Sequence, residues 1–378
     1  RVGCGEDAVV EHEIDLRKSA GVDVRPLILG GAQFDRLAVR TRLDIARGVS
    51  DHRWGRQCMV ASLEEWAPDV VHAHNLYPLL GIGALEEASG MGPATVQTWH
   101  NYRMSCLAGT HVRAGHPCQL CRVGHSRYGV MYGCYRGSRV QSALYARGTR
   151  TQLRALHRSV PEIVVCLTDA QREALVEQGI PPNRLVVKSN SVSEGVPGEW
   201  SSRHGAVYVG RLSEEKGIRG LLGSWDATAA QLTVVGTGPL EGALRAAFGG
   251  RSNITFTGSL SPSDVREALR AARVLAFPSL AAEGLPMTVL EALAEGTPVV
   301  AFAGGAPASI PSVTCVEYGD FRALAGALEG VCSCDESRWE GLSDESLKSH
   351  ARRYSDGQNI DALMRLYECA VARRAHRA

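Results

Sequence analysis

The sequence lacks any apolar run long enough to cross a membrane. A membrane-spanning helix needs about 18 or more consecutive apolar residues, and charged residues interrupt every hydrophobic run of this chain early. Low-complexity tracts and short internal repeats are absent as well. With 44% hydrophobic, 21% charged and 6% aromatic residues, the composition is close to that of an average globular domain. We therefore expect a folded protein that is not integral to a membrane.

A large net charge is also absent. The chain has 41 lysines and arginines against 40 aspartates and glutamates, so its net charge of +1 indicates neither a nucleic acid nor an acidic partner. The distribution is uneven, because no Asp or Glu occurs between Glu87 and Glu162. That stretch contains ten arginines: Arg103, Arg113, Arg122, Arg127, Arg136, Arg139, Arg147, Arg150, Arg154 and Arg158.

This one-sided charge predicts that the arginine-rich stretch meets an anion. The candidates are a phosphorylated acceptor, a lipid phosphate and an anionic membrane surface, which would bring the protein into peripheral contact with a membrane. Nucleic acid is disfavoured as a partner because no recognisable binding module accompanies the arginines.

Paired cysteine motifs are scarce. The eleven cysteines are an odd number, and Cys166 and Cys315 stand singly in apolar runs, as buried thiols do. This usage favours a reducing cytoplasm. One C-x2-C pair has a further cysteine on either side, so four thiolates could hold a structural zinc: Cys106, Cys118, Cys121 and Cys134. Reduced thiols or one disulfide would explain the same spacing.

An initiating methionine and a leading strand are both missing. The chain opens at Arg1 with a glycine-containing loop that runs into a helix. We therefore expect further sequence upstream, including a first strand. The lack of a signal peptide consequently carries little information on localisation.

Short apolar runs alternate with helical patterns along the whole chain. A length of 378 residues suggests two domains. Alternating strands and helices predict parallel sheets joined by right-handed crossovers, and therefore an α/β fold. The expected strands are residues 68–74, 94–100, 162–168, 206–210, 231–236, 253–258, 274–278 and 297–302.

A Ser-, Gly- and Pro-rich segment, residues 189–205, separates the two series of strands. We place the domain boundary there, with a first domain over residues 1–190 and a second over 191–354. A cleft between two doubly wound domains is the expected ligand site.

The second series begins with a strand that ends at Gly210 and is followed by two cations, Arg211 and Lys216. Strand carboxyl ends are where open α/β sheets bind ligands, and two cations there could hold a diphosphate. The alternative is that both cations pair with Glu214 and Glu215 on a solvated loop.

Two glycines, Gly236 and Gly238, lie between a strand and a helix. Bare backbone at these positions could approach a ligand and offer N–H groups to it. A tight turn is an equally good explanation. The third glycine of a dinucleotide-binding fingerprint is missing, which disfavours a Rossmann oxidoreductase.

The most informative segment is EGLPMTVLEALAEGTP, residues 283–298. Pro286 suits a helix start, and the free N–H groups of such a start offer a site for a diphosphate. Glu283 precedes this start and can accept hydrogen bonds from sugar hydroxyls. Glu291 lies among apolar neighbours and should have a partner, such as the two hydroxyls of a ribose. The alternatives are an N-capping role for Glu283 and a solvated position for Glu291.

With this segment, the chain resembles a retaining GT-B glycosyltransferase of the large family that includes bacterial mannosyl- and N-acetylglucosaminyltransferases. The resemblance rests on the E-x7-E motif formed by Glu283 and Glu291, and it covers nearly the whole chain. It implies that Arg211, Lys216 and Glu283 are catalytic. It further implies that the donor is held by Gly3, Gly5, Gly210, Gly236, Gly238, Gly284, Leu285, Pro286, Met287, Thr288 and Glu291.

The resemblance extends to the first domain. His100 and Asn101 stand at the end of a strand, where the family commonly has a histidine facing the donor sugar and the acceptor. His100 is therefore a fourth catalytic candidate, with Asn101 and Arg103 on the acceptor side. The family's C-terminal helix, expected over residues 355–378, crosses back to the N-terminal domain. A purely structural histidine is the alternative for His100.

The resemblance also implies the reaction. A sugar would move from a UDP- or GDP-sugar to a hydroxyl of a small or lipid-linked acceptor, with retention of anomeric configuration and without a metal ion or other cofactor. The expected location is the cytoplasm or the inner membrane surface. Two alternatives of other classes are a GT-B-fold nucleotide-sugar epimerase and a non-catalytic nucleotide-sugar-binding protein.

Overall fold

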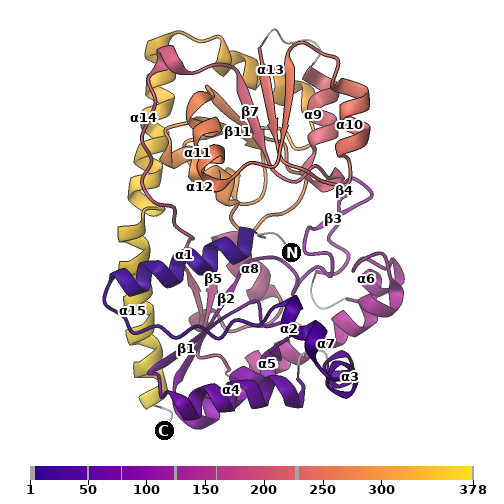
Figure 1. Cartoon of the computed structure of the whole chain (residues 1–378), viewed down its shortest axis with the longest axis vertical. Helices are drawn as coiled ribbons and strands as arrows, with labels where there is room; N and C mark the ends of the chain where they lie inside the picture. Colours follow the sequence, from indigo (N-terminus) through magenta and orange to yellow (C-terminus); the bar gives the residue numbers. More distant parts are fainter. Residues whose placement is uncertain are drawn as a thin grey trace. The chain divides into compact units, whose positions relative to one another are not determined.

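Two separate parallel β-sheets organise the computed structural model, which is shown in Figure 1. The structure describes residues 5–48, 51–77, 79–122, 126–158, 160–225 and 230–376. The chain divides into two compact units. The first unit comprises Arg1–His111, Cys118–Ser189 and Ile360–Ala378, and the second comprises Val112–Pro117 and Asn190–Asn359.

The sheet of the first unit has four parallel strands in the order β1-β2-β5-β6. Its strands are β1 (Val70–His74), β2 (Ala94–Trp99), β5 (Ile163–Cys166) and β6 (Leu185–Val187). Every residue of β2 and β5 is buried. This burial explains why β5 is a continuous apolar run, whereas β2 also buries the polar residues Thr95, Gln97 and Thr98.

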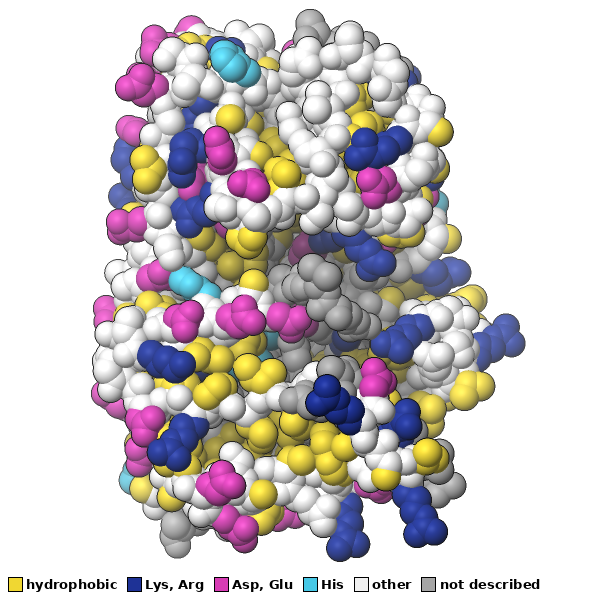
Figure 2. Space-filling view, viewed as in Figure 1, with side chains coloured by type: hydrophobic (Ala, Val, Ile, Leu, Met, Phe, Trp, Pro, Cys, Tyr) yellow, Lys and Arg dark blue, Asp and Glu magenta, His cyan; other side chains and the backbone are white. Residues whose placement is uncertain are grey.

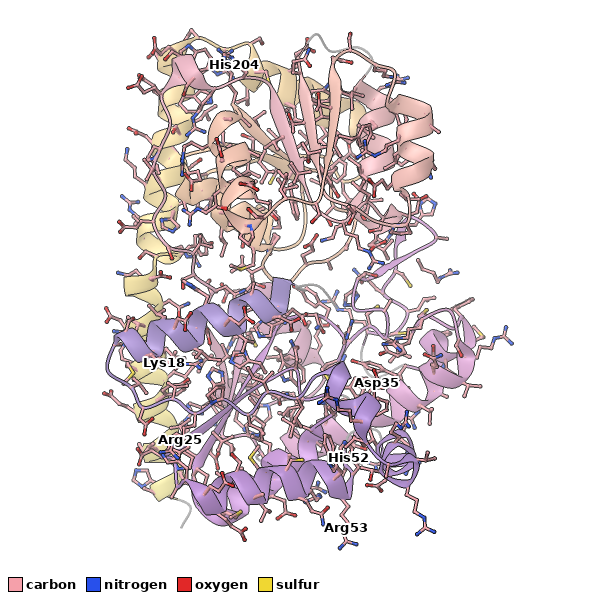
Figure 3. The ribbon with its side chains drawn as sticks, viewed as in Figure 1. Lys18, Arg25, Asp35, His52, Arg53 and His204 are labelled. Atoms are coloured by element: carbon pink, nitrogen blue, oxygen red, sulfur yellow. The ribbon has the colours of Figure 1, made fainter. Side chains whose placement is uncertain are left out.

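Eight helices of the first unit precede or connect its strands. They are α1 (Gly5–Ser19), α2 (Gly31–Arg36), α3 (Val39–Gly48), α4 (Arg53–Glu65), α5 (Gly81–Met91), α6 (Arg127–Met131), α7 (Arg139–His157) and α8 (Asp169–Glu177). The local sequence determines where several of these helices begin. The ring of His52 accepts a hydrogen bond from the Gly55 N–H at 3.1 Å and so caps α4 (Figure 3), and Thr168 caps α8.

The sheet of the second unit has six parallel strands in the order β12-β11-β10-β7-β8-β9. Its strands are β7 (Ala206–Val209), β8 (Leu232–Val235), β9 (Ile254–Gly258), β10 (Val274–Phe277), β11 (Val299–Phe302) and β12 (Val313–Val316). Its helices are α9 (Ile218–Ser224), α10 (Glu241–Phe248), α11 (Pro262–Ala271), α12 (Met287–Ala294), α13 (Phe321–Cys332) and α14 (Glu336–Arg353).

Helices cover both faces of this second sheet, with α9 and α10 on one side and α11 and α12 on the other (Figure 1). The core contains residues with no exposed surface from both strands and helices, among them Trp225, Val234 and Leu324. Burial on both faces explains why the central strands β10 and β11 are short apolar runs, whereas the edge strands β9 and β12 contain threonines and exposed positions.

The C-terminal helix α15 (Asp356–Ala375) contributes to the core of the first unit. Leu366 and Ala370 pack with Val96 and Ile163 of the sheet. Within the parts of the chain that the structure describes, neither this helix nor any other has the length and apolarity that a bilayer crossing requires.

The predicted α/β class with two doubly wound halves is confirmed. The expected strands all form, each within two residues of its predicted bounds. Apart from a one-residue shift of the boundary, at Asn190, the units differ from the predicted domains at two places. Val112–Pro117, which holds the hairpin of β3 (Val112–Arg113) and β4 (His116–Pro117), groups with the second unit, and the return to the first unit comes at Ile360, inside α15.

Candidate active site

The strand order of the second unit creates a point where the chain reverses its direction across the sheet. From β7 the chain proceeds to β8 and β9, and it then returns to β10 on the other side of β7. Open α/β sheets bind ligands outside the carboxyl ends of the strands at such a reversal. The loops after β7 and β10 hold Arg211, Lys216 and Glu283, so the topology brings these predicted residues to one edge.

Lys216 and Glu283 form an ion pair, with 2.8 Å between Nζ and Oε1. The hydroxyl of Ser279 donates to the same carboxylate oxygen at 2.5 Å. Both charged side chains keep some exposure, 29% for Lys216 and 17% for Glu283. The predicted alternative pairing of Lys216 with Glu214 or Glu215 does not form: Glu214 accepts from Arg219 and Glu215 from Ser213.

Arg211 is exposed and directly follows Gly210 at the end of β7. Its backbone is fixed, because the hydroxyl of Tyr208 donates to the Arg211 carbonyl at 2.9 Å. Its guanidinium forms no ion pair with any residue that the structure describes. The side chain therefore stands beside the Lys216 loop as a cation without an acidic partner in the described chain.

The two glycines after β8 have a structural explanation. A Cβ on Gly236 would lie 2.0 Å from the Gly210 carbonyl oxygen, and Gly236 has a φ of +132°. A Cβ on Gly238 would lie 2.4 Å from the Leu212 carbonyl oxygen. The loops after β7 and β8 thus pack backbone against backbone. This packing by itself requires glycine at both positions, and contact with a ligand remains a prediction.

The segment after β10 leads into α12 as the sequence predicts. Pro286 is the N-cap, one residue before the helix, and no side chain caps the first turn. Gly284, Leu285 and Pro286 are buried, whereas Met287 and Thr288 are partly exposed. The amide groups of an uncapped first turn attract an anion, and the positive end of the helix adds to this attraction.

Glu291 lies one turn into α12 and is half-buried. Its neighbours Val289, Leu290, Ala292, Leu293 and Ala294 are all buried, and burial raises the pKa of the Glu291 carboxyl. The carboxylate makes no hydrogen bond or ion pair with a residue that the structure describes. The sequence predicts that a carboxylate in such surroundings needs a partner, and within the described chain Arg266 attracts it electrostatically without a direct contact.

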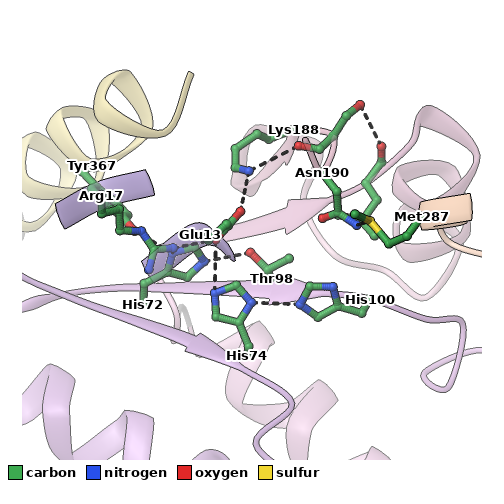
Figure 4. A network of polar contacts seen from close by, with 12 residues as sticks. Glu13, Arg17, His72, His74, Thr98, His100, Lys188, Asn190, Met287 and Tyr367 are labelled. Atoms are coloured by element: carbon green, nitrogen blue, oxygen red, sulfur yellow. Dashed lines mark hydrogen bonds and ion pairs between the residues drawn. The ribbon is translucent and has the colours of Figure 1, made fainter. Parts of the chain in front are cut away.

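A second polar cluster lies in the first unit, around the buried carboxylate of Glu13 in α1 (Figure 4). Lys188 donates to its Oε1 at 2.7 Å and Arg17 to its Oε2 at 2.6 Å. Burial alone would raise the pKa of Glu13, but attraction to Lys188 and Arg17 keeps it well below its usual value. Glu13 is therefore ionised and held between two buried cations.

His74 connects Glu13 to the predicted catalytic residue His100. The Nε2 atom of His74 lies 3.5 Å from Glu13 Oε2, and its Nδ1 lies 2.8 Å from His100 Nε2 (Figure 4). Burial lowers the pKa of His74 to about 3 and also lowers that of His100. Both rings are neutral at pH 7. Nε2 of His74 makes no hydrogen bond with a described residue, and the carboxylate nearest to it favours a proton at this atom. Nδ1 of His74 then accepts from Nε2–H of His100.

In the same cluster, hydrogen bonds determine which ring nitrogen of His72 carries the proton. Its Nδ1 lies 3.1 Å from Arg17 and 2.7 Å from the hydroxyl of Tyr367. A guanidinium can only donate, so Nδ1 accepts, and the proton sits on Nε2, which donates to Thr98 at 2.8 Å. Burial lowers the pKa of His72 well below its usual value, in agreement with a neutral ring.

Glu13, His72 and His74 have ligand atoms within 4.8 Å of one another, a spacing that a metal ion could bridge. Their other contacts argue for a different role. Both oxygens of Glu13 already accept from cations, and both ring nitrogens of His72 are engaged. An added cation would lie beside Arg17 and Lys188. The cluster therefore has the properties of a hydrogen-bonded charge network.

Of the remaining predicted residues of the first unit, Asn101 directly follows His100. The amide of Asn101 donates to Glu6 Oε1 at 2.9 Å, and Asn75 donates to the other oxygen of Glu6 at 2.9 Å. Arg103 is exposed, with its stem against Gly109. Gly5 begins α1, and Gly3 lies outside the described residues.

Two family models match the chain. The model described as "Glycosyl transferase 4-like domain" matches residues 3–191, and the model described as "Glycosyl transferases group 1" matches residues 203–333. The first match alone covers half of the chain. The chain belongs to this family of glycosyltransferases.

Curated relatives of this glycosyltransferase act on different substrates. It is 29% identical over 338 residues to a 2-deoxystreptamine N-acetyl-D-glucosaminyltransferase of Streptomyces fradiae, covering 82% of this chain and 72% of the relative. It is 30% identical over 212 residues to a phosphatidyl-myo-inositol mannosyltransferase of Mycobacterium leprae, covering 52% and 55%. A D-inositol 3-phosphate glycosyltransferase of Corynebacterium kroppenstedtii is 34% identical over 127 residues, 32% of this chain and 28% of that relative's length.

Solved structures share the fold. Anabaena HepE in complex with UDP and glucose aligns with a TM-score of 0.58 at 14% identity, covering 82% of each chain. Sucrose-phosphate synthase of Thermosynechococcus elongatus aligns with a TM-score of 0.61 at 17% identity, covering 84% of this chain and 77% of that chain. At these identities the similarity shows the GT-B fold alone.

The four cysteines of the predicted zinc site lie in the first unit, and zinc binding there stays a prediction. The four cysteines lie near enough that Cys106, Cys118 and Cys134 all influence the thiol of Cys121. No three of them, however, bring their sulfur atoms within 4.8 Å of one another. Cys134 packs beside the Leu107 and Tyr145 cluster, whereas Cys118 follows the β3–β4 hairpin.

Sequence reasoning missed Glu13, His72, His74 and Lys188. A signal for the histidines was present in VVHAH, because two histidines at alternate positions of a strand point to the same face. Glu13 and Lys188 had no comparable signal. They are 175 residues apart, and only the packing of α1 beside the end of β6 brings them together.

Proposed function

We propose that this glycosyltransferase moves a sugar from a nucleotide-diphosphate sugar to an acceptor hydroxyl. The observation that carries the proposal is the Lys216–Glu283 pair at the reversal point of the second sheet, between Arg211 and the uncapped start of α12. Two cations and free amides suit a diphosphate, and a carboxylate beside them suits sugar hydroxyls.

In this proposal, the bond between the anomeric carbon and the diphosphate breaks while a bond to the acceptor oxygen forms, and the proton of the acceptor hydroxyl passes to the departing diphosphate. Negative charge develops on the leaving diphosphate, and Arg211, Lys216 and the amides of α12 stabilise it. These fixed positive charges neutralise the leaving diphosphate, as a metal ion would in other enzymes, so the reaction proceeds without a metal ion. Glu291 binds the ribose. Retention of configuration and a UDP- or GDP-sugar donor are supported by the family resemblance.

We assign acceptor binding to the first unit, where we expect the acceptor to contact His100, Asn101 and Arg103. The arginine-rich stretch favours an anionic acceptor, either a small molecule or a lipid-linked one. The ten described cysteines are all free thiols, which supports the cytoplasm as the compartment. A peripheral position at the inner membrane surface would bring the enzyme to a lipid-linked acceptor.

The test combines donor binding with transfer. UDP- and GDP-sugars are first ranked by thermal shift, and the best donor is then assayed with candidate acceptors, with and without EDTA. We expect Lys216→Ala and Glu283→Ala each to lower kcat/KM by about 100-fold or more, because each removes a preorganised charge at the reacting centre. NMR of the product reports the anomeric configuration.

The matched control is Lys348→Ala, which breaks an exposed pair with Asp344 in the same unit and should leave transfer unchanged. Full activity of either site variant would overturn the site. A donor sugar that is epimerised without an acceptor would favour the epimerase. Loss of activity in EDTA would overturn metal independence.

A further inference from the structure

Exposed apolar side chains gather in one short part of the first unit. Of the eleven large hydrophobic residues that are exposed in the described chain, five lie within residues 120–144: Leu120, Met131, Tyr132, Val140 and Leu144. Val140 has the largest exposed fraction of all eleven, at 71%. Such a concentration of exposed apolar groups marks an interaction surface.

The same part of the chain is strongly cationic. Residues 88–161 hold ten of the 41 basic residues and none of the 40 acidic ones, so the rest of the chain has 31 basic residues against 40 acidic. Two of the ten are neutralised from outside the stretch, Arg122 by Glu177 and Arg158 by Glu86. No described acidic residue pairs with the four exposed arginines of α7, which are Arg139, Arg147, Arg150 and Arg154.

Helix α7 carries both kinds of side chain on its outer face. Val140, Leu144, Arg147 and Arg154 follow one another at intervals of four, three and seven residues, which places them on one side of a helix. The opposite side is buried at Ser142, Tyr145, Ala146 and Thr149. In Figure 2, the lobe that contains α6 shows dark blue and yellow side chains next to one another.

We propose that this face docks on the surface of an anionic lipid bilayer. We define the α7 face as Val140 and Leu144 together with Arg139, Arg147, Arg150 and Arg154, which the helical spacing places on one side of α7. The guanidinium groups bind lipid phosphates, and the apolar side chains between them enter the interface. This combination distinguishes a bilayer from a soluble polyanion, which would leave the apolar groups in water. The proposed function includes a peripheral position at the inner membrane surface. The present proposal rests on that statement alone and names the surface that would contact the membrane.

The test is co-sedimentation of the full chain with vesicles. We expect binding to vesicles that contain phosphatidylglycerol, no binding to vesicles of phosphatidylcholine alone, and weaker binding as salt screens the charges. The triple variant Arg147→Glu, Arg150→Glu, Arg154→Glu should bind at least about tenfold more weakly. Its control reverses three exposed arginines of the second unit, Arg322, Arg338 and Arg352, and should bind nearly as the unmodified protein does.

A second pair of variants tests whether the apolar side chains of the α7 face contribute to vesicle binding. Val140→Asp should weaken vesicle binding, whereas Val196→Asp, at 67% exposure in the second unit, should not. These positions are exposed, so thermal melting should report intact folding for all variants. The proposal would be overturned by equal binding to vesicles with and without phosphatidylglycerol. It would also be overturned if the α7 variants and the control variants lost vesicle binding to the same extent. Capture of single-stranded RNA by the same arginines without vesicle binding would overturn it as well. Vesicle binding needs no sugar donor, so it can fail while sugar transfer succeeds.

Discussion

Three glutamates show how the surroundings of a carboxylate decide its role. Glu13 is buried between two cations and is ionised. Glu283 is partly exposed and shares its oxygen with Lys216 and Ser279. Glu291 is desolvated, with a raised pKa and no hydrogen-bond or ion-pair partner among the described residues. Glu13 is therefore suited to hold the fold, and the other two to meet a ligand.

Glu291→Gln should separate ligand binding from stability. Burial raises the pKa of this carboxyl, so its ionised form costs the apo protein stability at neutral pH. The amide removes that cost, and we expect a melting temperature that is unchanged or higher. We also expect the stabilisation by UDP or GDP to fall, because a carboxylate binds a pair of hydroxyls better. A lower melting temperature with full nucleotide binding would instead indicate a structural role.

Glu13→Gln should destabilise the protein by about 3–5 kcal/mol, because it leaves two buried cations without their carboxylate. Arg17 and Lys188 keep only 8% and 4% of their side chains exposed, so water cannot replace it. Urea unfolding measures the change. The control is Glu11→Gln at an exposed position of the same helix, with no expected effect. Equal stability of both variants would show that the charge network is not needed for the fold.

At the scale of elements, the site of the second unit consists of strand-to-helix connections. The loops after β7 and β8 touch through their backbones at Gly236 and Gly238. The loop after β10 ends at Pro286, where α12 begins without a side-chain cap. Rigid, closely packed loops hold charged groups in place before a ligand arrives, which is the condition for electrostatic stabilisation of a transition state.

Gly236→Ala should test this loop contact. The added methyl group would meet the Gly210 carbonyl at 2.0 Å in a backbone conformation that alanine avoids, so we expect a loss of about 2–4 kcal/mol. Donor binding should weaken with it. Gly242→Ala, in the first turn of α10 with nothing within 4 Å, should instead stabilise by up to about 1 kcal/mol. Thermal melting of both variants checks the difference, and similar effects would contradict the packing argument.

At the scale of the whole molecule, the histidine network links stability to pH. An unfolded histidine has a pKa near 6.5, whereas burial lowers the pKa of His74 to about 3 and shifts His72 and His100 in the same direction. Below about pH 6.5 the unfolded chain therefore binds more protons than the folded one. The stabilisation is fully present above that pH and is lost as the pH falls towards the folded pKa values.

We accordingly expect the free energy of unfolding to decrease between about pH 7 and pH 5, by up to about 1.4 kcal/mol per pH unit for each neutral buried histidine. Glu13 does not contribute in this window, because its pKa is lowered further below its usual value. Urea unfolding at several pH values measures the slope. His74→Gln should flatten it, and an unchanged slope would show that His74 is not the titrating group.

The sequence by itself determined the α/β class, eight of the ten strands in the two parallel sheets and the carboxyl-end positions of Arg211, Lys216, Glu283 and His100, but it did not predict β6 and β12. It could determine these features because apolar runs, glycines and a helix start are local patterns that only a few folds satisfy. Their roles in binding and catalysis stay predictions.

Only the tertiary structure decided which side chains meet. It paired Lys216 with Glu283, 67 positions further along the chain, and it placed Glu13 between Arg17 and Lys188. It also set the distances among the four cysteines whose spacing suggested zinc, of which no three bring their sulfur atoms within 4.8 Å of one another. The physical reason is that strand order and helix packing set distances between remote residues, and no local pattern records them.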